Sequence, residues 1–232
     1  MTKEKDLTIP DMSTGSDRTT QEYVYGRIRH AIMIGAIPPG TVLTMRGLAD
    51  TMGLSPTPIR EAVRRLSSVN AIQVNKSRRL SIPEMTSGRF EELVALRITL
   101  EKHAAERALP YVSDIKITTM TGLDDEMDNA IVDNDWDRLT ILNHDFHRTL
   151  YTVNPDQVTL PVIESIWLQL GPFQRQALEM LKEFYTIDRH KEILAALATR
   201  DATALVKATE YDIRDSIYKA GRKLLTAGAA AA

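Results

Sequence analysis

Two short amphipathic helices joined by a glycine turn constrain the fold of this 232-residue chain more than any other feature. The pattern predicts a helix from Arg46 to Met52, a turn at Gly53-Leu54-Ser55, and a second helix from Pro56 to Val69. Ser55 is a favourable N-cap, and Pro56 stands where a missing N–H costs nothing. The second helix carries apolar residues at i, i+3, i+4 and i+7, which must face a core: Ile59, Ala62, Val63 and Leu66.

One more helix and a basic hairpin complete this module. Apolar residues recur at three- and four-residue intervals from Thr20 to about Ile34, and Gly35 follows as a helix stop. After Asn70 the pattern changes to the alternating segments Ile72-Gln73-Val74 and Leu80-Ser81-Ile82 around a basic loop, which predicts a two-stranded hairpin. This order of elements is that of a winged helix-turn-helix, in which the helix after the turn enters the major groove of DNA.

The distribution of charge agrees with such a module. The net charge of the chain is −2, but residues 21–85 hold nine Lys and Arg against four Asp and Glu, whereas residues 86–232 hold 17 against 23. A basic segment joined to an acidic one is typical of a DNA-binding domain linked to a domain with another function.

Composition excludes several classes of protein. Cysteine is absent, which excludes disulfides, thiolate nucleophiles and sulfur-ligated zinc. No stretch approaches the roughly 18 uninterrupted apolar residues that span a bilayer, so no membrane partner is expected. The polar N-terminus lacks the apolar segment of a secretory signal, and we expect a cytoplasmic protein.

The rest of the chain has helical periodicity and no strand signal. Amphipathic helices with short connections favour an antiparallel bundle, so the predicted fold is mainly α, with an N-terminal winged helix-turn-helix and a C-terminal all-helical bundle. The expected parts are a flexible tail at 1–19, the DNA-binding domain at 20–83, the helical effector-binding and dimerisation domain at 86–223, and a flexible tail at 224–232.

Two stretches resemble a known family. Residues 32–82 resemble the DNA-binding head of the GntR family of bacterial transcription regulators, through IMIGAIPPGTVL, RGLADTMGLSPTPIREAVRRL and LSIPEMT. The second part resembles the all-helical ligand-binding domain of the FadR subgroup, called FCD, through LRITLEKHAAERA, LNHDFHRTLY and RHKEILAALATRDATAL. The resemblance implies a regulator, most often a repressor, that binds a pseudo-palindromic operator as a homodimer and responds to a small metabolite. It implies no enzymatic activity.

The predicted recognition helix supplies the candidate DNA contacts. Thr57 and Arg60 project from its N-terminal half, and Arg60 is the leading base reader because a guanidinium pairs with guanine O6 and N7. Phosphate contacts are expected from the hydroxyls and basic groups around it. These are Arg46, Ser55, Thr57 and Arg64, with Lys76, Arg78 and Arg79 in the wing. The alternative is that these are solvated surface charges.

A metal site is the second candidate. Asn143 and His147 are four residues apart, so a helix places both on one face, where they can share one ion. In the resembled domain four positions converge on a metal, usually an acid or Asn followed by three histidines. The resemblance assigns them to Asn143, His147, His190 and Asp212, with Asp212 where the last histidine is usual. Nitrogen and oxygen ligands suit Zn, Ni, Mn or Fe. Spacing alone favours a core histidine at 147 and a surface acid at 212, and the resemblance is what favours a metal site.

Arg97 is the candidate effector ligand. It matches an arginine that lies in the pocket of the resembled domain, and a guanidinium grips a carboxylate bidentately, so an organic acid is the expected effector. Its alternative role is an i, i+4 pair with Glu101.

Two other functions remain open at this stage. One is a regulator of the same family whose metal site is vestigial. The other is a metalloenzyme built on the same four residues, although it lacks an obvious general base and leaves the basic head unexplained.

Overall fold

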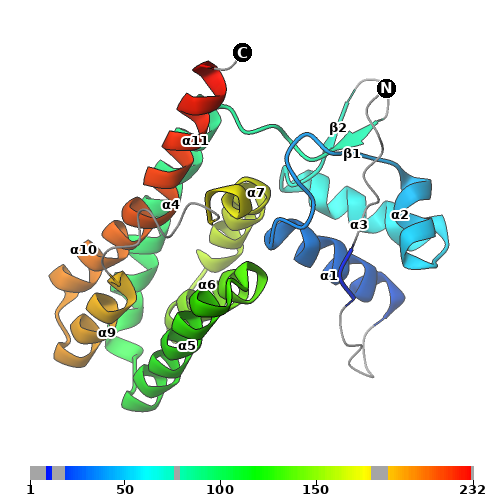
Figure 1. Cartoon of the computed structure of the whole chain (residues 1–232). Coiled ribbons are helices and arrows are strands. Elements are labelled where there is room, and N and C mark those ends of the chain that lie inside the picture. Colours follow the sequence, from blue (N-terminus) through cyan, green and yellow to red (C-terminus); the bar gives the residue numbers. More distant parts are fainter. Residues whose placement is uncertain (1–8, 12–18, 76–78, 179–187, 231–232) are drawn as a thin grey trace. The chain divides into compact units, whose positions relative to one another are not determined.

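The computed structural model describes residues 9–11, 19–75, 79–178 and 188–230, and it forms two compact units. The first unit takes in the chain up to Met85 together with Trp167–Arg175, and the second takes in Thr86–Ile166 and the chain from Gln176. Figure 1 labels the helices and strands of both. In the described part of the chain, no helix is long and apolar enough to cross a membrane.

The helices of the first unit begin and end at the expected signals. α1 (Thr20–Met33) starts with a capping box, in which Glu22 N donates to Thr19 Oγ1 and Thr19 N donates to the Glu22 carboxylate. α2 (Met45–Met52) ends at Gly53, whose φ of 64° lies in the left-handed region that favours glycine. α3 (Pro56–Ser68) buries the predicted apolar stripe, Ile59, Ala62, Val63 and Leu66, and packs against α1. The predicted helix-turn-helix is confirmed.

The wing has one strand more than the sequence predicts. β2 (Gln73–Val74) and β3 (Leu80–Ser81) form the hairpin, and β1 (Val42–Leu43) pairs with the other edge of β3, which gives the antiparallel order β1-β3-β2. Val42 faces Ser81 in the register. A strand of two residues is too short to show alternation, so its sequence carries no signal.

The first unit also includes residues from the predicted N-terminal tail. Ile9 is buried, and the Arg27 guanidinium donates to the carbonyl oxygens of Ile9 and Pro10 at 2.9 and 3.2 Å. Tyr23 OH donates to Asp11 Oδ1 at 2.6 Å. The prediction of a flexible tail over 1–19 is therefore wrong for residues 9–11, because backbone carbonyls of a polar segment satisfy an arginine on α1.

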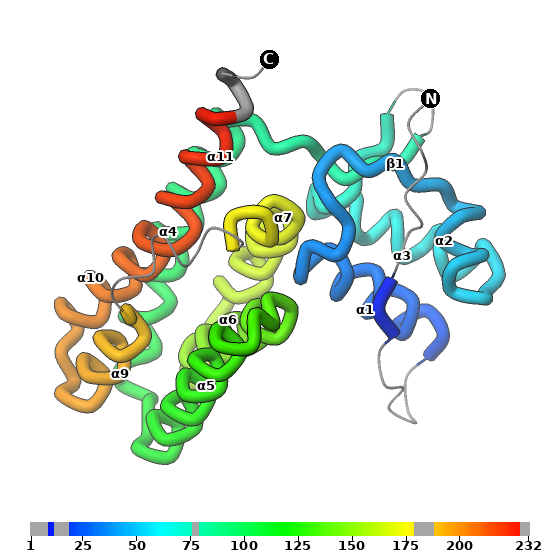
Figure 2. The backbone as a smooth tube through the Cα atoms, in the orientation of Figure 1, coloured from blue at the N-terminus to red at the C-terminus, as the bar shows by residue number. Residues whose placement is uncertain are grey.

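The second unit is built of helices, and Figure 2 follows the course of its described backbone. Ser113, Asp135, Asp188 and Asp201 cap helices by accepting backbone N–H groups, while Asn134 and Arg200 end helices at positive φ. α5 packs on α6, α9 on α10, and α10 on α4. The elements are α4 (Ser87–Ala108), η1 (Leu109–Tyr111), α5 (Asp114–Asp133), α6 (Trp136–Tyr151), α9 (Arg189–Thr199), α10 (Ala202–Ile213), η2 (Arg214–Tyr218) and α11 (Lys219–Ala230). α7 (Leu160–Leu178) is divided, because its residues Trp167–Arg175 belong to the first unit and its two ends to the second.

Two details of the second unit differ from prediction. The helical pattern of the C-terminal part gives no sign of the π-helical segment η2, which begins at Arg214, two residues after Asp212. The residues from 224 continue α11 as far as Ala230, so they are not the expected tail. Alanine has the highest helix propensity of all residues, which explains why this end of the chain stays helical.

Candidate functional site

α3 presents a polar face opposite its buried stripe. Thr57 and Arg60 lie on its exposed side, and Ser55 is exposed and extended just before the first turn. Among the described residues, Arg60 forms no ion pair. Hydroxyls, unpaired helix N–H groups and a guanidinium thus meet at the N-terminal end of the helix, which is the end that reaches base edges in a helix-turn-helix.

Other predicted DNA contacts surround this face. Arg46 on α2 has a side chain that is 92% exposed and lies 3.7 Å from Asp50. Arg64 lies 3.1 Å from Glu61 on α3 itself. Exposed ion pairs contribute little to stability, so both arginines can exchange their carboxylate for a phosphate. Arg79 is exposed at the base of the wing, whereas Lys76 and Arg78 lie outside the described residues.

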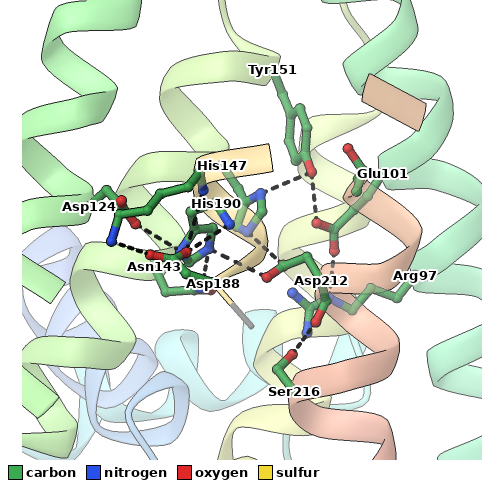
Figure 3. A network of polar contacts seen from close by, with 12 residues as sticks. Arg97, Glu101, Asp124, Asn143, His147, Tyr151, Asp188, His190, Asp212 and Ser216 are labelled. Atoms are coloured by element: carbon green, nitrogen blue, oxygen red, sulfur yellow. Dashed lines mark hydrogen bonds and ion pairs between the residues drawn. The ribbon is translucent and has the colours of Figure 1, made fainter. Parts of the chain in front are cut away.

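A second site lies among the helices of the second unit, where the structure brings together the four residues predicted as metal ligands (Figure 3). Asn143 and His147 come from α6, His190 from α9 and Asp212 from α10. His147, His190 and Asp212 are buried, and each offers a ligand atom within 4.8 Å of the others.

Asp212 is the centre of this cluster. His147 Nε2 lies 3.2 Å from one of its carboxylate oxygens, and His190 Nε2 lies 3.6 Å from the other. Asn143 Nδ2 lies 3.3 Å from His190 Nε2. Both histidines therefore turn the same ring atom, Nε2, towards one carboxylate.

The other nitrogen of His190 faces two further acids. Its Nδ1 lies 3.3 Å from Asp124 Oδ1, and Asp124, Asp188 and His190 form a second group of close ligand atoms. Asp188 also caps α9 and pairs with Lys191. We interpret Asp124 as the residue that orients the His190 ring, since ligating histidines usually donate their second N–H to a carboxylate.

Burial and charge oppose each other in this cluster. Burial alone would lower the pKa of His190, but the charge of Asp212 and the hydrogen bond with Asp124 outweigh it and raise the pKa. Burial alone would raise the pKa of Asp212, but the charge of His190 and the contact with His147 hold it well below its usual range. The cluster is therefore an ionised carboxylate held between two imidazoles.

Arg97 lies next to this cluster but is paired. Its Nε donates to Glu101 Oε1 at 2.6 Å, and both side chains are almost completely buried. Burial lowers the pKa of the Arg97 guanidinium, and the carboxylate of Glu101 raises it by more, so the net shift is upward. The bond to Glu101 uses Nε and leaves the two terminal nitrogens to bind a second acceptor.

The donor set fits a divalent cation. His147 Nε2 is a buried nitrogen without a well-directed hydrogen bond, although it lies beside the Asp212 carboxylate. Two imidazole nitrogens of borderline softness, together with hard carboxylate and amide oxygens, suit zinc, nickel, manganese or iron.

Sequence reasoning missed three residues that contact these side chains: Glu101 as part of the site, Asp124 and Tyr151. Tyr151 follows His147 by four residues and Glu101 follows Arg97 by four, so helical spacing was a usable signal for both. Asp124 had no such signal, because only the packing of α5 against α9 brings it to His190.

Comparison with known families decides the identity of the chain. Residues 20–82 match the family of bacterial regulatory proteins called gntR, and residues 92–215 match the FCD domain. The chain belongs to the GntR family, with an FCD domain as its second part. It is a DNA-binding transcription regulator with a ligand-binding helical domain, as the sequence predicts.

Individual relatives share this organisation. The HTH-type transcriptional regulator McbR of Escherichia coli is 28% identical over 177 residues, which cover 75% of this chain and 80% of McbR. The gluconate operon transcriptional repressor of Bacillus subtilis is 24% identical over 225 residues, which cover 93% of this chain and 90% of the repressor. The solved structure of McbR has a TM-score of 0.81 at 24% identity and covers 89% of this chain and 99% of that one, which shows the same fold.

Proposed function

We propose that this GntR-family chain represses transcription by binding a pseudo-palindromic operator as a homodimer, and that a small carboxylate controls this binding from the helical domain, assisted by a divalent metal. The observation that carries the proposal is the buried cluster of His147, His190 and Asp212, which offers ligand atoms within 4.8 Å of one another. Because an operator is part of the chromosome, the proposal places the protein in the cytoplasm.

Repression is supported by a relative that matches most of the chain. The gluconate operon repressor of Bacillus subtilis aligns over both domains, and its name states the direction of its action. A repressor blocks transcription by occupying its operator. An effector changes operator binding when it has different affinities for two arrangements of the two DNA-binding domains.

Arg97 supports a carboxylate as the effector. Its Nε donates to Glu101, both groups are buried, and its terminal nitrogens can hold an anion. A metal held by His147, His190 and Asp212 would supply a second point of attachment for a carboxylate oxygen. An effector with a carboxylate and a neighbouring oxygen would use both.

The DNA-binding role of Arg60 is tested with purified full-length protein. Operator sequences are selected from random or genomic DNA, and binding of Arg60→Ala is compared with the wild type. We expect a loss of about 1–3 kcal/mol, or roughly 5- to 150-fold in Kd, because a guanidinium that reads guanine is removed.

Arg107→Ala is the matched control, because Arg107 is an exposed arginine on α4 in the other unit. It should leave operator affinity unchanged. Sequence-specific binding that survives in Arg60→Ala, with an unchanged preference at every base, would remove Arg60 from the interface.

Metal content tests the second half of the proposal. Untagged protein purified without chelators is measured by elemental mass spectrometry beside His147→Ala and Asp212→Ala. We expect about one metal per chain in the wild type and in the control His103→Ala, which changes an exposed histidine on α4. Both site variants should lose the metal, because each removes one ligand of a small set.

One observation favours a second candidate, a regulator without metal. Asp212 lies between two imidazoles and Glu101 balances Arg97, so the cluster can also satisfy its charges internally. A wild type that stays free of metal after incubation with Zn²⁺, Ni²⁺ or Mn²⁺ would establish this candidate.

A further inference from the structure

The central part of α7 belongs to the DNA-binding unit although the sequence assigns the whole helix elsewhere. Trp167–Arg175 group with the first unit, and the two ends of α7 group with the second. The gntR match ends at residue 82, whereas the FCD match covers residues 92–215 and so includes all of α7. The structure therefore adds to the DNA-binding unit a segment that lies far beyond its family boundary in the sequence.

Gly171 brings this segment of α7 against the backbone at the end of α1. A methyl group on Gly171 would lie 2.5 Å from the carbonyl oxygen of Met33 and 2.7 Å from that of Ile32. Both oxygens belong to the backbone of the last turn of α1, so they cannot swing aside as a flexible side chain would. Only glycine, which has no Cβ, permits this approach of backbone to backbone.

The turn after α1 makes a second close contact with the same part of α7. Gly35 has a φ of 73°, and its N–H donates to Ile32 O at 3.0 Å. A methyl group on Gly35 would lie 2.8 Å from Gly171 O and would also meet Arg175 Cβ. Two glycines thus let the end of α1 and the middle of α7 pack with no side chain between them.

Apolar side chains on both sides of this contact are buried. They are Trp167, Leu168, Leu170 and Phe173 on α7, and Ile32, Met33 and Ile34 at the end of α1. Closely packed interiors are rigid and transmit small displacements. The α7 segment is therefore part of the core of the first unit, and a shift of this segment is a shift of the end of α1.

We infer that the central part of α7 is a structural component of the DNA-binding unit and the element through which the helical domain acts on DNA binding. α1 packs against α3, the predicted recognition helix, so a displaced α7 segment disturbs the helix on which α3 rests. Both ends of α7 belong to the second unit, so a ligand of that unit acts on the segment along one continuous helix of 19 residues. This regulatory part rests on the proposed function.

Hydrogen–deuterium exchange of the full chain, read by mass spectrometry, tests the structural part. Gly171→Ala is compared with the control Gly122→Ala, the same change within α5, where a methyl group meets no atom within 4 Å. We expect peptides of α1 to exchange about tenfold faster or more in Gly171→Ala, while those of α5 and α6 stay unchanged. Gly122→Ala should leave exchange in α1 as it is in the wild type.

Phe173→Leu is a milder change that keeps the test decisive if Gly171→Ala does not fold. Phe173 is buried in the same part of α7, and Phe146→Leu makes the same change at a buried position on α6. We expect Phe173→Leu to speed exchange in α1, and Phe146→Leu to speed it in α5 and α6 only. Unchanged exchange of α1 in a folded Gly171→Ala or Phe173→Leu would overturn the inference.

Operator binding tests the regulatory part. The Kd for selected operator DNA is measured with and without Zn²⁺ for the wild type and for Gly171→Ala. We expect Zn²⁺ to change the Kd of the wild type and to change that of Gly171→Ala several-fold less, because the connection through α7 is weakened. Equal responses of the two folded proteins would exclude α7 as the regulatory connection.

The failure of the proposed function is distinguishable from the failure of this inference. If Zn²⁺ leaves the operator affinity of the wild type unchanged, the metal part of the proposed function is wrong. Exchange of α1 in Gly171→Ala and Phe173→Leu needs no metal and still decides whether the middle of α7 belongs to the DNA-binding unit.

Discussion

At the scale of single residues, the unusual feature is Asp212 in a position where the resembled domain usually has a histidine. Its carboxylate is buried between His147 and His190, with Asp124 on the far side of the His190 ring. A buried charge is stable only when it is paired. Asp212 therefore places a negative charge where a neutral imidazole is usual, and the charges of the cluster depend on each other.

Asp212→Asn tests this dependence in chelator-treated protein. Asp212 raises the pKa of His190, so His190 stabilises the fold at pH values below its unfolded pKa of about 6.5, and this contribution is lost as the pH rises through the folded pKa. Asn removes it. We expect the variant to lose about 1–3 kcal/mol at pH 6 and less at pH 9.

Urea unfolding at both pH values, with nitrogen-15 NMR of His190, measures this effect. The opposite order, with a larger loss at pH 9, would show that the charge of Asp212 does not act on His190.

At the scale of elements, the helices are delimited by caps and by residues at positive φ. Gly53 has a φ of 64° and sets the angle between α2 and α3, so it positions the recognition helix. Asn70 adopts a φ of 56° after α3. Asn is one of the few residues with a side chain that tolerate this region.

Two glycine-to-alanine changes should have opposite signs. A methyl group on either Gly53 or Gly122 meets no atom within 4 Å, so neither change creates a clash. Gly53→Ala forces a side chain into positive φ and should cost about 1–2 kcal/mol. Gly122→Ala lies within α5 and should stabilise by about 0.5–1 kcal/mol, because alanine is the better helix former.

Urea unfolding of the two variants beside the wild type gives both values. Equal effects of the two changes would mean that the backbone conformation at Gly53 is not the one described.

At the scale of the whole molecule, the DNA-binding part and the helical part of the chain differ in the sign of their net charge. Residues 21–85 carry an excess of basic side chains, while residues 86–232 carry an excess of acidic ones. The basic excess of residues 21–85 attracts the phosphate backbone of DNA, whereas the acidic excess of residues 86–232 does not. The proposed dimer would place two heads on two half-sites, because one α3 is expected to contact few bases.

Operator length and salt test this arrangement. A DNA with both half-sites should bind a dimer much more tightly than a DNA with one half-site, and its affinity should fall steeply with salt, with a slope of about −0.9 per phosphate contact. Electrophoretic mobility shift at several salt concentrations measures both quantities. Equal affinity for one and two half-sites would argue that the protein binds DNA as a monomer.

The sequence by itself determined the local structure and the two-part organisation. The i, i+3, i+4, i+7 stripe of α3, the turn at Gly53 and the caps at Thr19 and Asp188 are interactions within a few residues, so a linear pattern records them. The same applies to Asn143 and His147, because one helix turn relates them.

Only the tertiary structure decided how the distant residues meet. The pairing of β1 with β3, the packing of Ile9 and Asp11 on α1, and the contact of Asp124 with His190 join residues far apart in the chain, for which spacing carries no information. Tyr151 shows the same limit. Its place on α6 follows from the sequence, but its hydrogen bond to Glu101 depends on the packing of α6 against α4.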